Sequence, residues 1–205
     1  MEKQKVVIVG FGASFTEAKE MSDESKKWLN ILGRKLREEF PEYEFVLINS
    51  GKGGNSAREA MVRFESGVLS HDPDFVILDL CANNMSPARS EEHRVDQKEF
   101  NNILEDYKSS LPKKTKTVLF TPPPVYEDIH PHGKRPEFKA FYQQYGGWGK
   151  LGNLYKDIYR NFARENKFPI YDLYNELLAL GNKNGRERYI FEDGIHFEYG
   201  VGPDK

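Results

Sequence analysis

Four short segments, far apart in the sequence, carry residue types that can work together on an acyl group. They are Gly12-Ala13-Ser14, Gly53-Gly54-Asn55, Ala82-Asn83-Asn84 and Asp193-Gly194-Ile195-His196. A serine hydroxyl becomes a nucleophile when a histidine takes its proton, and an aspartate can orient that histidine. Backbone and side-chain amides can stabilise the oxyanion that forms next. These residues therefore predict an enzyme that transfers or hydrolyses acyl groups.

Each of the first three segments follows an apolar run that is typical of a β-strand. The runs are Val6–Val9, Glu44–Ile48 and Asp74–Leu80. If these strands are parallel, their carboxyl ends open on one edge of the sheet, where open α/β folds bind ligands. The sequence therefore predicts that the segments meet in space, although more than 40 residues can separate one from the next.

Strand and helix patterns alternate along the chain, which favours βαβ units, a mostly parallel sheet and one domain over residues 1–205. Residues 121–149 contain several prolines and predict a long loop after the fourth strand, and loops of this length are often functional. The remaining predicted elements are helices at Ser22–Phe40, Ser56–Val68, Glu91–Leu111, around Leu151–Phe162 and up to Leu180, and strands at Thr117–Phe120 and Pro169–Tyr171.

The composition excludes several classes of protein. Charged residues make up 30% of the chain with a net charge of −2 and no basic block, so we expect no nucleic-acid partner. Cys81 is the only cysteine, which excludes an intrachain disulfide. The apolar run near the N-terminus is too short to span a membrane and has no signal-cleavage pattern. A cytoplasmic protein is the default expectation, and a secreted chain that lacks its signal peptide fits equally well.

The sequence suggests two cofactor sites, one for a dinucleotide and one for zinc, but its residues do not fit either. Gly10-Phe11-Gly12 begins like a dinucleotide fingerprint, but Phe15 occupies the third glycine position and the second strand ends in Asn49 rather than an acidic residue. His130 and His132 are only two positions apart in a loop with Pro131, and zinc needs further ligands. We therefore predict neither a metal nor another cofactor.

Each candidate segment also has an ordinary structural interpretation. Ser14 or Thr16 can cap a helix, Gly54 can form a turn, and Asn83 can bind loop carbonyls. A pair like Asp193 and His196 occurs in many loops. The functional interpretation is favoured because four separate loops would each have to imitate one part of the same site.

Together the four segments resemble the motif blocks of the SGNH hydrolases, also called the GDSL esterase/lipase family. The family blocks hold a serine in G-D-S, a glycine after the second strand, an asparagine in G-x-N-D and a C-terminal D-x-x-H. Here the order and spacing match from residue 6 to about residue 200. The resemblance implies a flavodoxin-like three-layer α/β/α sandwich, here with a five-stranded sheet, and ester hydrolysis without a metal.

The resemblance also implies a role for each matching residue. Ser14 would be the nucleophile, His196 the base and Asp193 its orienting partner. The backbone N–H groups of Ser14 and Gly54 and the side-chain amide of Asn83 would form the oxyanion hole.

The chain departs from the family pattern at several places. Ala13, Cys81 and Asn84 stand where the family has aspartate, glycine and aspartate, respectively. Family members usually continue into a helix that packs on the sheet, whereas this sequence reaches Lys205 soon after His196.

The residues that would contact substrate are less clearly marked. We predict Asn55, Asn84, Tyr145 and Trp148, because aromatic rings in the segment 141–148 could wall a pocket or stack on a sugar. The same rings could equally cover the sheet edge as hydrophobic mass. The predicted partner is a small-molecule ester, such as an acetylated carbohydrate. The alternatives are a lysophospholipid or thioester substrate, or an inactive member of the fold that binds a carbohydrate or a protein partner.

Overall fold

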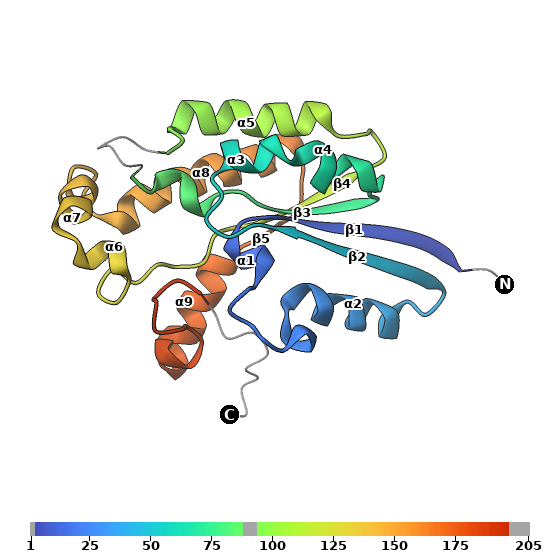
Figure 1. The fold of residues 1–205 in the computed structure, drawn as a ribbon, viewed down its shortest axis with the longest axis horizontal. Coiled ribbons are helices and arrows are strands. Elements are labelled where there is room, and N and C mark those ends of the chain that lie inside the picture. The colour runs from blue at the N-terminus through green and yellow to red at the C-terminus, as the bar shows by residue number, and fades with distance from the viewer. Residues whose placement is uncertain (1–2, 88–93, 197–205) are drawn as a thin grey trace.

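Five parallel strands in the order β2-β1-β3-β4-β5 form the sheet at the centre of the protein (Figure 1). This arrangement comes from a computed structural model that describes residues 3–87 and 94–196. The strands are β1 (Gln4–Gly12), β2 (Tyr43–Gly51), β3 (Phe75–Asp79), β4 (Lys116–Phe120) and β5 (Ile170–Tyr171). The predicted α/β fold with a five-stranded sheet is confirmed.

The register of the three strands at one side of the sheet brings their carboxyl ends level. Gly12, the last residue of β1, pairs with Gly51 on β2 and with Asp79 on β3. Gly12 leaves no room for a side chain, because a Cβ there would lie 2.4 Å from the carbonyl oxygen of Asp79. The loops that follow β1, β2 and β3 therefore start from one closely packed edge.

Helices cover both faces of the sheet (Figure 1). One face carries α1 (Ser14–Glu17), α2 (Trp28–Glu39) and α9 (Leu173–Asn184). The other face carries α3 (Ala57–Val62), α4 (Phe64–Gly67), α5 (Gln97–Ser110) and α8 (Trp148–Asn166). Short 3₁₀ turns complete the described elements: η1 (Glu24–Lys26), η2 (Leu69–His71), η3 (Ala82–Met85) and η4 (Arg186–Arg188).

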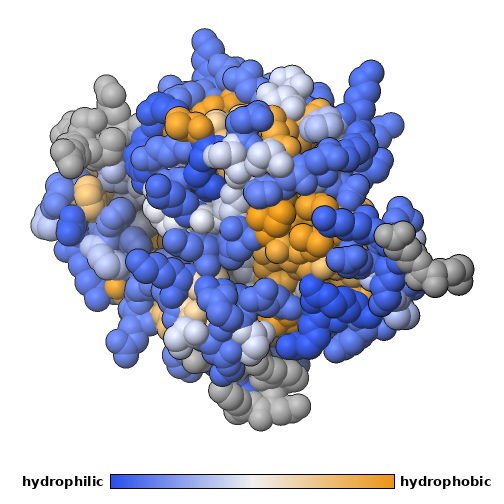
Figure 2. Space-filling model, turned by 45° about the vertical axis from the view of Figure 1, so that its right-hand side comes forward, coloured by the Kyte–Doolittle hydropathy of each residue, from blue (hydrophilic) through white to orange (hydrophobic). Residues whose placement is uncertain are grey.

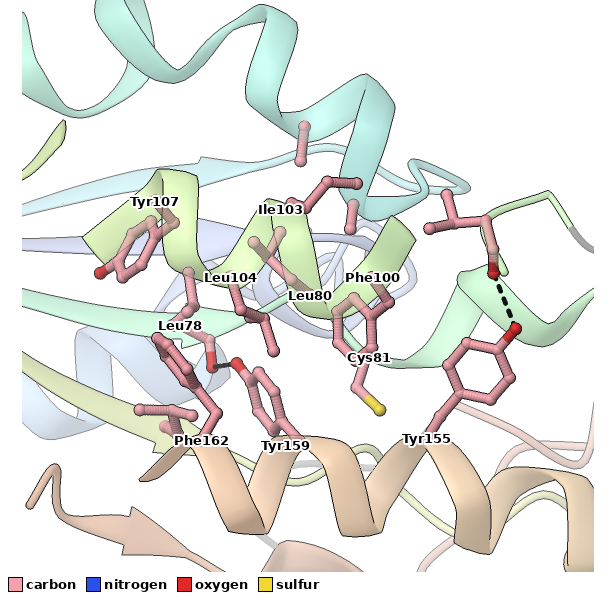
Figure 3. Close-up of a cluster of buried hydrophobic side chains, with 14 of the residues drawn as sticks. Leu78, Leu80, Cys81, Phe100, Ile103, Leu104, Tyr107, Tyr155, Tyr159 and Phe162 are labelled. Atoms are coloured by element: carbon pink, nitrogen blue, oxygen red, sulfur yellow. Dashed lines mark hydrogen bonds between the residues drawn. The ribbon is translucent and has the colours of Figure 1, made fainter. Parts of the chain in front are cut away.

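The main hydrophobic core lies between the sheet and the helices α5 and α8 (Figure 3). Tyrosines from α8 enter this core and place their hydroxyls on backbone carbonyls. Tyr159 donates to the Leu78 carbonyl at 2.7 Å, and Tyr155 donates to the Val95 carbonyl at the same distance. Because buried hydroxyls need partners, these bonds fix α8 to β3 and to the chain before α5.

The outer surface is mostly hydrophilic, with one larger apolar area in the view of Figure 2. None of the helices in the described part of the chain is long and apolar enough to cross a membrane.

Three predicted elements differ in detail from the structure. The helix predicted at 22–40 starts at Trp28, after the separate turn η1. The helix predicted at 56–68 begins after Ser56 with a capping box to Glu59, but it is interrupted at Arg63, where ψ is +13°. The helix predicted from residue 91 is described only from Gln97, with Asp96 as its cap, because residues 88–93 lie outside the described part.

The predicted loop at 121–149 contains two helices, α6 (Pro131–Lys134) and α7 (Pro136–Gln143). Both begin with proline at the first helical position, where the missing N–H does no harm and the fixed φ fits. Two of the prolines that suggested a structureless loop, Pro131 and Pro136, are thus helix starts, whereas Pro122, Pro123 and Pro124 lie outside helices and strands. The C-terminal helix considered above would fall on residues 197–205, which lie outside the described residues.

Candidate active site

A cavity of about 700 Å³ opens at the carboxyl ends of β1, β2 and β3. All four predicted segments contribute to its lining, among them the candidate site residues Ser14, Gly54, Asn83 and His196. The fold therefore brings together the candidate nucleophile, base and oxyanion donors, which are far apart in sequence. This edge is also where an open parallel sheet binds ligands.

Ser14 is the first residue of α1, and the residue that caps this helix is Ala13. The serine is therefore not the helix cap. Its side chain is partly exposed at the cavity, while its neighbours Ala13 and Phe15 are buried. We call residues 12–16 the Ser14 turn. It places a hydroxyl at the cavity beside the amino end of a short helix, where backbone N–H groups are not used within the helix.

Gly54 and Asn83 lie beside this turn, on the loops that follow β2 and β3. Gly54 has a φ of +75°, a conformation that glycine adopts without strain. The amide nitrogen of Asn83 donates to the carbonyl of Asn55 at 3.0 Å. A primary amide carries two hydrogens, so this bond orients Asn83 and leaves the second hydrogen for a ligand. The prediction that Asn83 binds a loop carbonyl and the prediction that it faces the site are thus compatible.

Asn84 has a different position from its neighbour and is fully buried. Its side-chain oxygen accepts from the backbone N–H of Ala57 at 2.8 Å, and its nitrogen donates to the carbonyl of Leu80 at 2.7 Å. Both ends of the amide are therefore occupied by backbone. The substrate contact that we expected of Asn84 does not fit this position, because a side chain without exposed surface cannot touch a ligand in the cavity.

Asp193 and His196 form a close pair. The Asp193 Oδ2 atom lies 2.6 Å from His196 Nδ1, and Asp193 Oδ1 accepts from the backbone N–H groups of Ile195 and His196. Partial burial raises the pKa of Asp193, but the hydrogen bonds from the backbone and ring of His196 outweigh it and bring the pKa below its ordinary value. The carboxylate is therefore ionised at neutral pH and able to orient the ring.

The other ring nitrogen of His196 is shielded from solvent and, among the described residues, has no hydrogen-bond partner. Its nearest acidic neighbour is Glu20, whose Oε1 atom is 3.8 Å away. No hydrogen bond joins Ser14 to His196 within the described residues. Contacts of this kind are often long in a ligand-free enzyme and tighten when substrate binds.

Aromatic rings form one wall of the cavity. Trp148 lies edge-on to His130 with ring centroids 4.7 Å apart, and His132 packs beside the same indole at 5.7 Å. Behind the wall, Tyr142 stacks on Trp148 at 4.5 Å. Burial lowers the pKa of His130 to about 4 and also lowers the pKa of His132, so both rings are neutral at pH 7.

Only one of the four predicted substrate-binding residues lies in the described lining of the cavity. Trp148 lines the cavity, whereas Asn55, Asn84 and Tyr145 are absent from its described lining. Asn55 positions Asn83 through its carbonyl, and Tyr145 packs against the main core. The aromatic segment 141–148 therefore has both predicted roles, because Trp148 lines the cavity while Tyr145 is part of the hydrophobic packing. The described residues contain no group of three His, Cys, Asp or Glu side chains that could hold a metal ion.

Two residues that support the site, the partly buried Arg63 and the buried Asp79, were not predicted. Arg63 donates from one guanidinium to the carbonyls of Gly12 and Ser50 and to the side chain of Asn55, and so joins the ends of β1 and β2. Asp79 accepts hydrogen bonds from the Ser14 turn. An arginine in a predicted helix gives no signal of this role. A carboxylate at the end of an apolar strand was the available signal for Asp79.

Residues 8–199 match the GDSL-like Lipase/Acylhydrolase family, and the chain belongs to that family. The resemblance inferred from the four segments is therefore confirmed.

Known proteins similar to this chain agree with the family. The uncharacterized lipoprotein YqeF of Bacillus subtilis (strain 168) is 23% identical over 199 residues, covering 92% of this chain and 79% of YqeF. The structure of a lipase/acylhydrolase from Enterococcus faecalis is 24% identical, with a TM-score of 0.71 and coverage of 94% and 87% of the two chains. The acetyl xylan esterase AlAXEase is 26% identical, with the same TM-score and coverage of 94% and 91%.

Proposed function

We propose that this protein is a serine esterase that hydrolyses carboxylic esters through an acyl-enzyme. The observation that carries the proposal is the arrangement of Ser14, Gly54, Asn83 and His196 around one cavity, with Asp193 bonded to the far nitrogen of the histidine. Each of these groups has one part of the reaction to perform.

In the first half-reaction, the Ser14 Oγ atom attacks the ester carbonyl carbon while His196 Nε2 takes the hydroxyl proton. Asp193 stabilises the resulting imidazolium through Nδ1. The oxyanion accepts hydrogen bonds from the N–H groups of Ser14 and Gly54 and from the free amide hydrogen of Asn83. As the tetrahedral intermediate collapses, His196 returns the proton to the departing alcohol.

In the second half-reaction, water replaces the alcohol. His196 takes a proton from this water as the oxygen attacks the acyl carbon, and the same donors hold the second oxyanion. Collapse releases the carboxylic acid and restores the Ser14 hydroxyl. In both half-reactions His196 passes the proton between Ser14, water and the substrate, so the protons balance.

For the substrate, we propose a short acyl group, such as acetyl, on a carbohydrate. His130 and His132, which line the cavity beside Trp148 and are neutral at pH 7, give it an uncharged aromatic wall of a kind that sugar rings contact. The similarity to an acetyl xylan esterase also supports this choice.

We also propose where in the cell the protein is located. The curated relative YqeF is named a lipoprotein. This favours a secreted or surface-anchored protein over the cytoplasmic default. Fractionation of cells that produce the natural protein checks the choice, and recovery in the cytosolic fraction alone would reject it.

The function is tested by hydrolysis of p-nitrophenyl esters from acetate to decanoate, with the wild type and Ser14→Ala. We expect activity that is highest for acetate and absent in the variant. Release of acetate from an acetylated xylo-oligosaccharide then tests the alcohol half. Activity that peaks at long chains would favour a lysophospholipid substrate. Turnover that is independent of Ser14, or no turnover at all, would reject the esterase and favour an inactive binding protein.

A further inference from the structure

Two aspartates connect β3 to β1, one at each end of β3. At the start, Asp74 Oδ2 accepts from the backbone N–H of Val7 at 2.8 Å. At the end, Asp79 Oδ2 accepts from the backbone N–H of Ala13 at 3.3 Å. The first connection lies at the opposite end of the sheet from the cavity. The second lies directly behind Ser14.

Asp79 contacts the Ser14 turn on both sides of the serine. Besides Ala13, which precedes Ser14, its Oδ2 atom accepts a hydrogen bond from the hydroxyl of Thr16 at 3.0 Å. Both Ala13 and Thr16 are buried. One carboxylate oxygen thus fixes the chain immediately before and after the residue that must point its hydroxyl into the cavity.

Burying the Asp79 carboxylate lowers the stability of the fold. Asp79 is only 2% exposed, and within the described residues no lysine or arginine lies at ion-pair distance from it. Cys81 and Tyr159 are two groups whose pKa an ionised Asp79 raises, and neither of them is a cation. Burial raises the pKa of Asp79 to about 7, against the opposing effect of the bonds from Thr16 and Ala13. Buried groups that cost stability are retained where they serve a site.

The sequence of the Ser14 turn gives a reason for the carboxylate. The turn reads Gly12-Ala13-Ser14, with alanine where the motif of the resembling family has aspartate. This turn therefore has no acidic side chain next to its serine. Asp79 brings a carboxylate to the same turn from the neighbouring strand, through the close approach of Gly12 and Asp79.

We propose that Asp79 is a positioning residue for the nucleophile: its carboxylate holds the Ser14 turn in the conformation that presents the hydroxyl to the ester. This inference rests on the proposed function, in which Ser14 attacks the substrate. Asp79 itself touches neither substrate nor the reacting atoms. It acts through the backbone of Ala13 and the hydroxyl of Thr16.

The alternative is that Asp79 only stabilises the fold, and the two roles predict opposite relations between stability and activity. A structural carboxylate would lose stability and activity together when it is replaced. A positioning carboxylate that is costly to bury can be replaced with no loss of stability and still reduce turnover. Steady-state kinetics and thermal unfolding of the same variants therefore separate the two roles.

The experiment compares Asp79→Leu, Asp79→Asn and the control Asp74→Asn with wild type at pH 8. Leucine fills the volume without an acceptor, and misplacement of a reacting group can cost on the order of 10²-fold. We therefore expect kcat to fall about 100-fold with little change in KM. The asparagine side-chain oxygen can take the place of Oδ2 and accept from both the Ala13 N–H and the Thr16 hydroxyl, so this variant should recover most of the loss. Both variants should unfold at the wild-type temperature or above.

The control should keep wild-type kcat even if it unfolds at lower temperature, because Asp74 lies far from the cavity. If Asp79→Leu does not fold, Asp79→Ala, which also lacks an acceptor, takes its place in the comparison of kcat and of the rate of labelling by a fluorophosphonate. The proposal is overturned if a folded Asp79 variant without an acceptor turns over at the wild-type rate, or if its kcat falls only together with its unfolding temperature. A Ser14→Ala variant assayed alongside tests the proposed function separately. If Ser14 is not the nucleophile, this variant retains activity, and the proposed function itself has failed.

Discussion

Ser14, Gly54 and Asn83 lie on turns that directly follow strands of the sheet, whereas Asp193 and His196 lie on a turn beyond the last described helix. The first group is fixed to the fold by side chains from other elements, mainly the partly buried Arg63 and the buried Asp79. In the second group, the hydrogen bonds of Asp193 go to Ile195 and His196 of its own turn.

The turn of residues 193–196, which we call the histidine turn, touches the rest of the protein through a few backbone bonds. Gly194 accepts from the N–H of Tyr126 at 3.0 Å, and the His196 carbonyl accepts from Phe191 at 2.8 Å. Gly194 also has a φ of +73° and lies close to Ile129. The comparison teaches that stability and activity depend on different side chains within the nucleophile half, while changes in the histidine half should affect activity far more than stability.

The largest effect is expected from the histidine half. His196→Ala removes the only base proposed for Ser14, so kcat should fall by about 10⁴-fold or more. The unfolding temperature should stay at the wild-type value, because the backbone bonds of the turn remain and the ring is bonded only to Asp193 among the described residues. Kinetics with p-nitrophenyl acetate and a thermal melt measure both quantities. A large loss of stability would show that the histidine turn is part of the folding core.

The next effect distinguishes two adjacent asparagines in the nucleophile half. Asn83→Ala removes a proposed oxyanion donor and should lower kcat by about 10²–10³-fold with only a small effect on stability. Asn84→Ala leaves the Ala57 N–H and the Leu80 carbonyl buried without their side-chain partner. Its free energy of unfolding should fall by roughly 1–3 kcal/mol for each unpaired group. Urea unfolding and kcat are measured on both variants. The assignment is contradicted if Asn83→Ala loses mainly stability and Asn84→Ala loses mainly kcat.

The smallest effect is a pH dependence of stability that differs between the two halves. The pKa of Asp79 is raised in the folded state from 3.8 to about 7, so the folded protein binds a proton there more tightly than the unfolded chain does. The stability that this proton provides is complete at low pH and is lost as the pH rises towards about 7. The pKa of Asp193 is lowered instead, so its contribution is present above its unfolded value and is lost in acid.

Urea unfolding between pH 4 and pH 8 checks this difference. Relative to Asp79→Asn, the wild type should lose stability as the pH rises. Parallel curves for the two proteins would show that Asp79 does not take up a proton on folding. An Asp193→Asn variant is the matched control: its difference from wild type should stay nearly constant over this range, because the lowered pKa of Asp193 moves its change to more acidic solution.

Much of this site could be predicted from the sequence because strands and their ends leave a local signal. The runs before Ser14 and Asn83 are apolar and end in small or polar residues, and parallel pairing then brings their ends together. The Asp193 and His196 pair is also local, since three positions separate the partners. Such features depend on short stretches of chain.

The residues that were missed depend on contacts between distant elements. Arg63 and Asp79 act on backbone groups more than 50 residues away, and nothing in their neighbouring sequence indicates these partners. Asn84 was expected at the substrate because it follows Asn83, but the 3₁₀ turn η3 directs the two amides differently. The helices α6 and α7 were hidden because proline indicates a loop and a helix start alike.

The central claim is that Ser14 is the nucleophile that His196 activates. The most direct measurement is labelling of the intact protein with a fluorophosphonate, followed by mass spectrometry of its peptides. We expect a single adduct on Ser14 that forms in the wild type, is absent in Ser14→Ala and is strongly slowed in His196→Ala. An adduct on another residue, or labelling of Ser14 at the same rate without His196, would contradict the account.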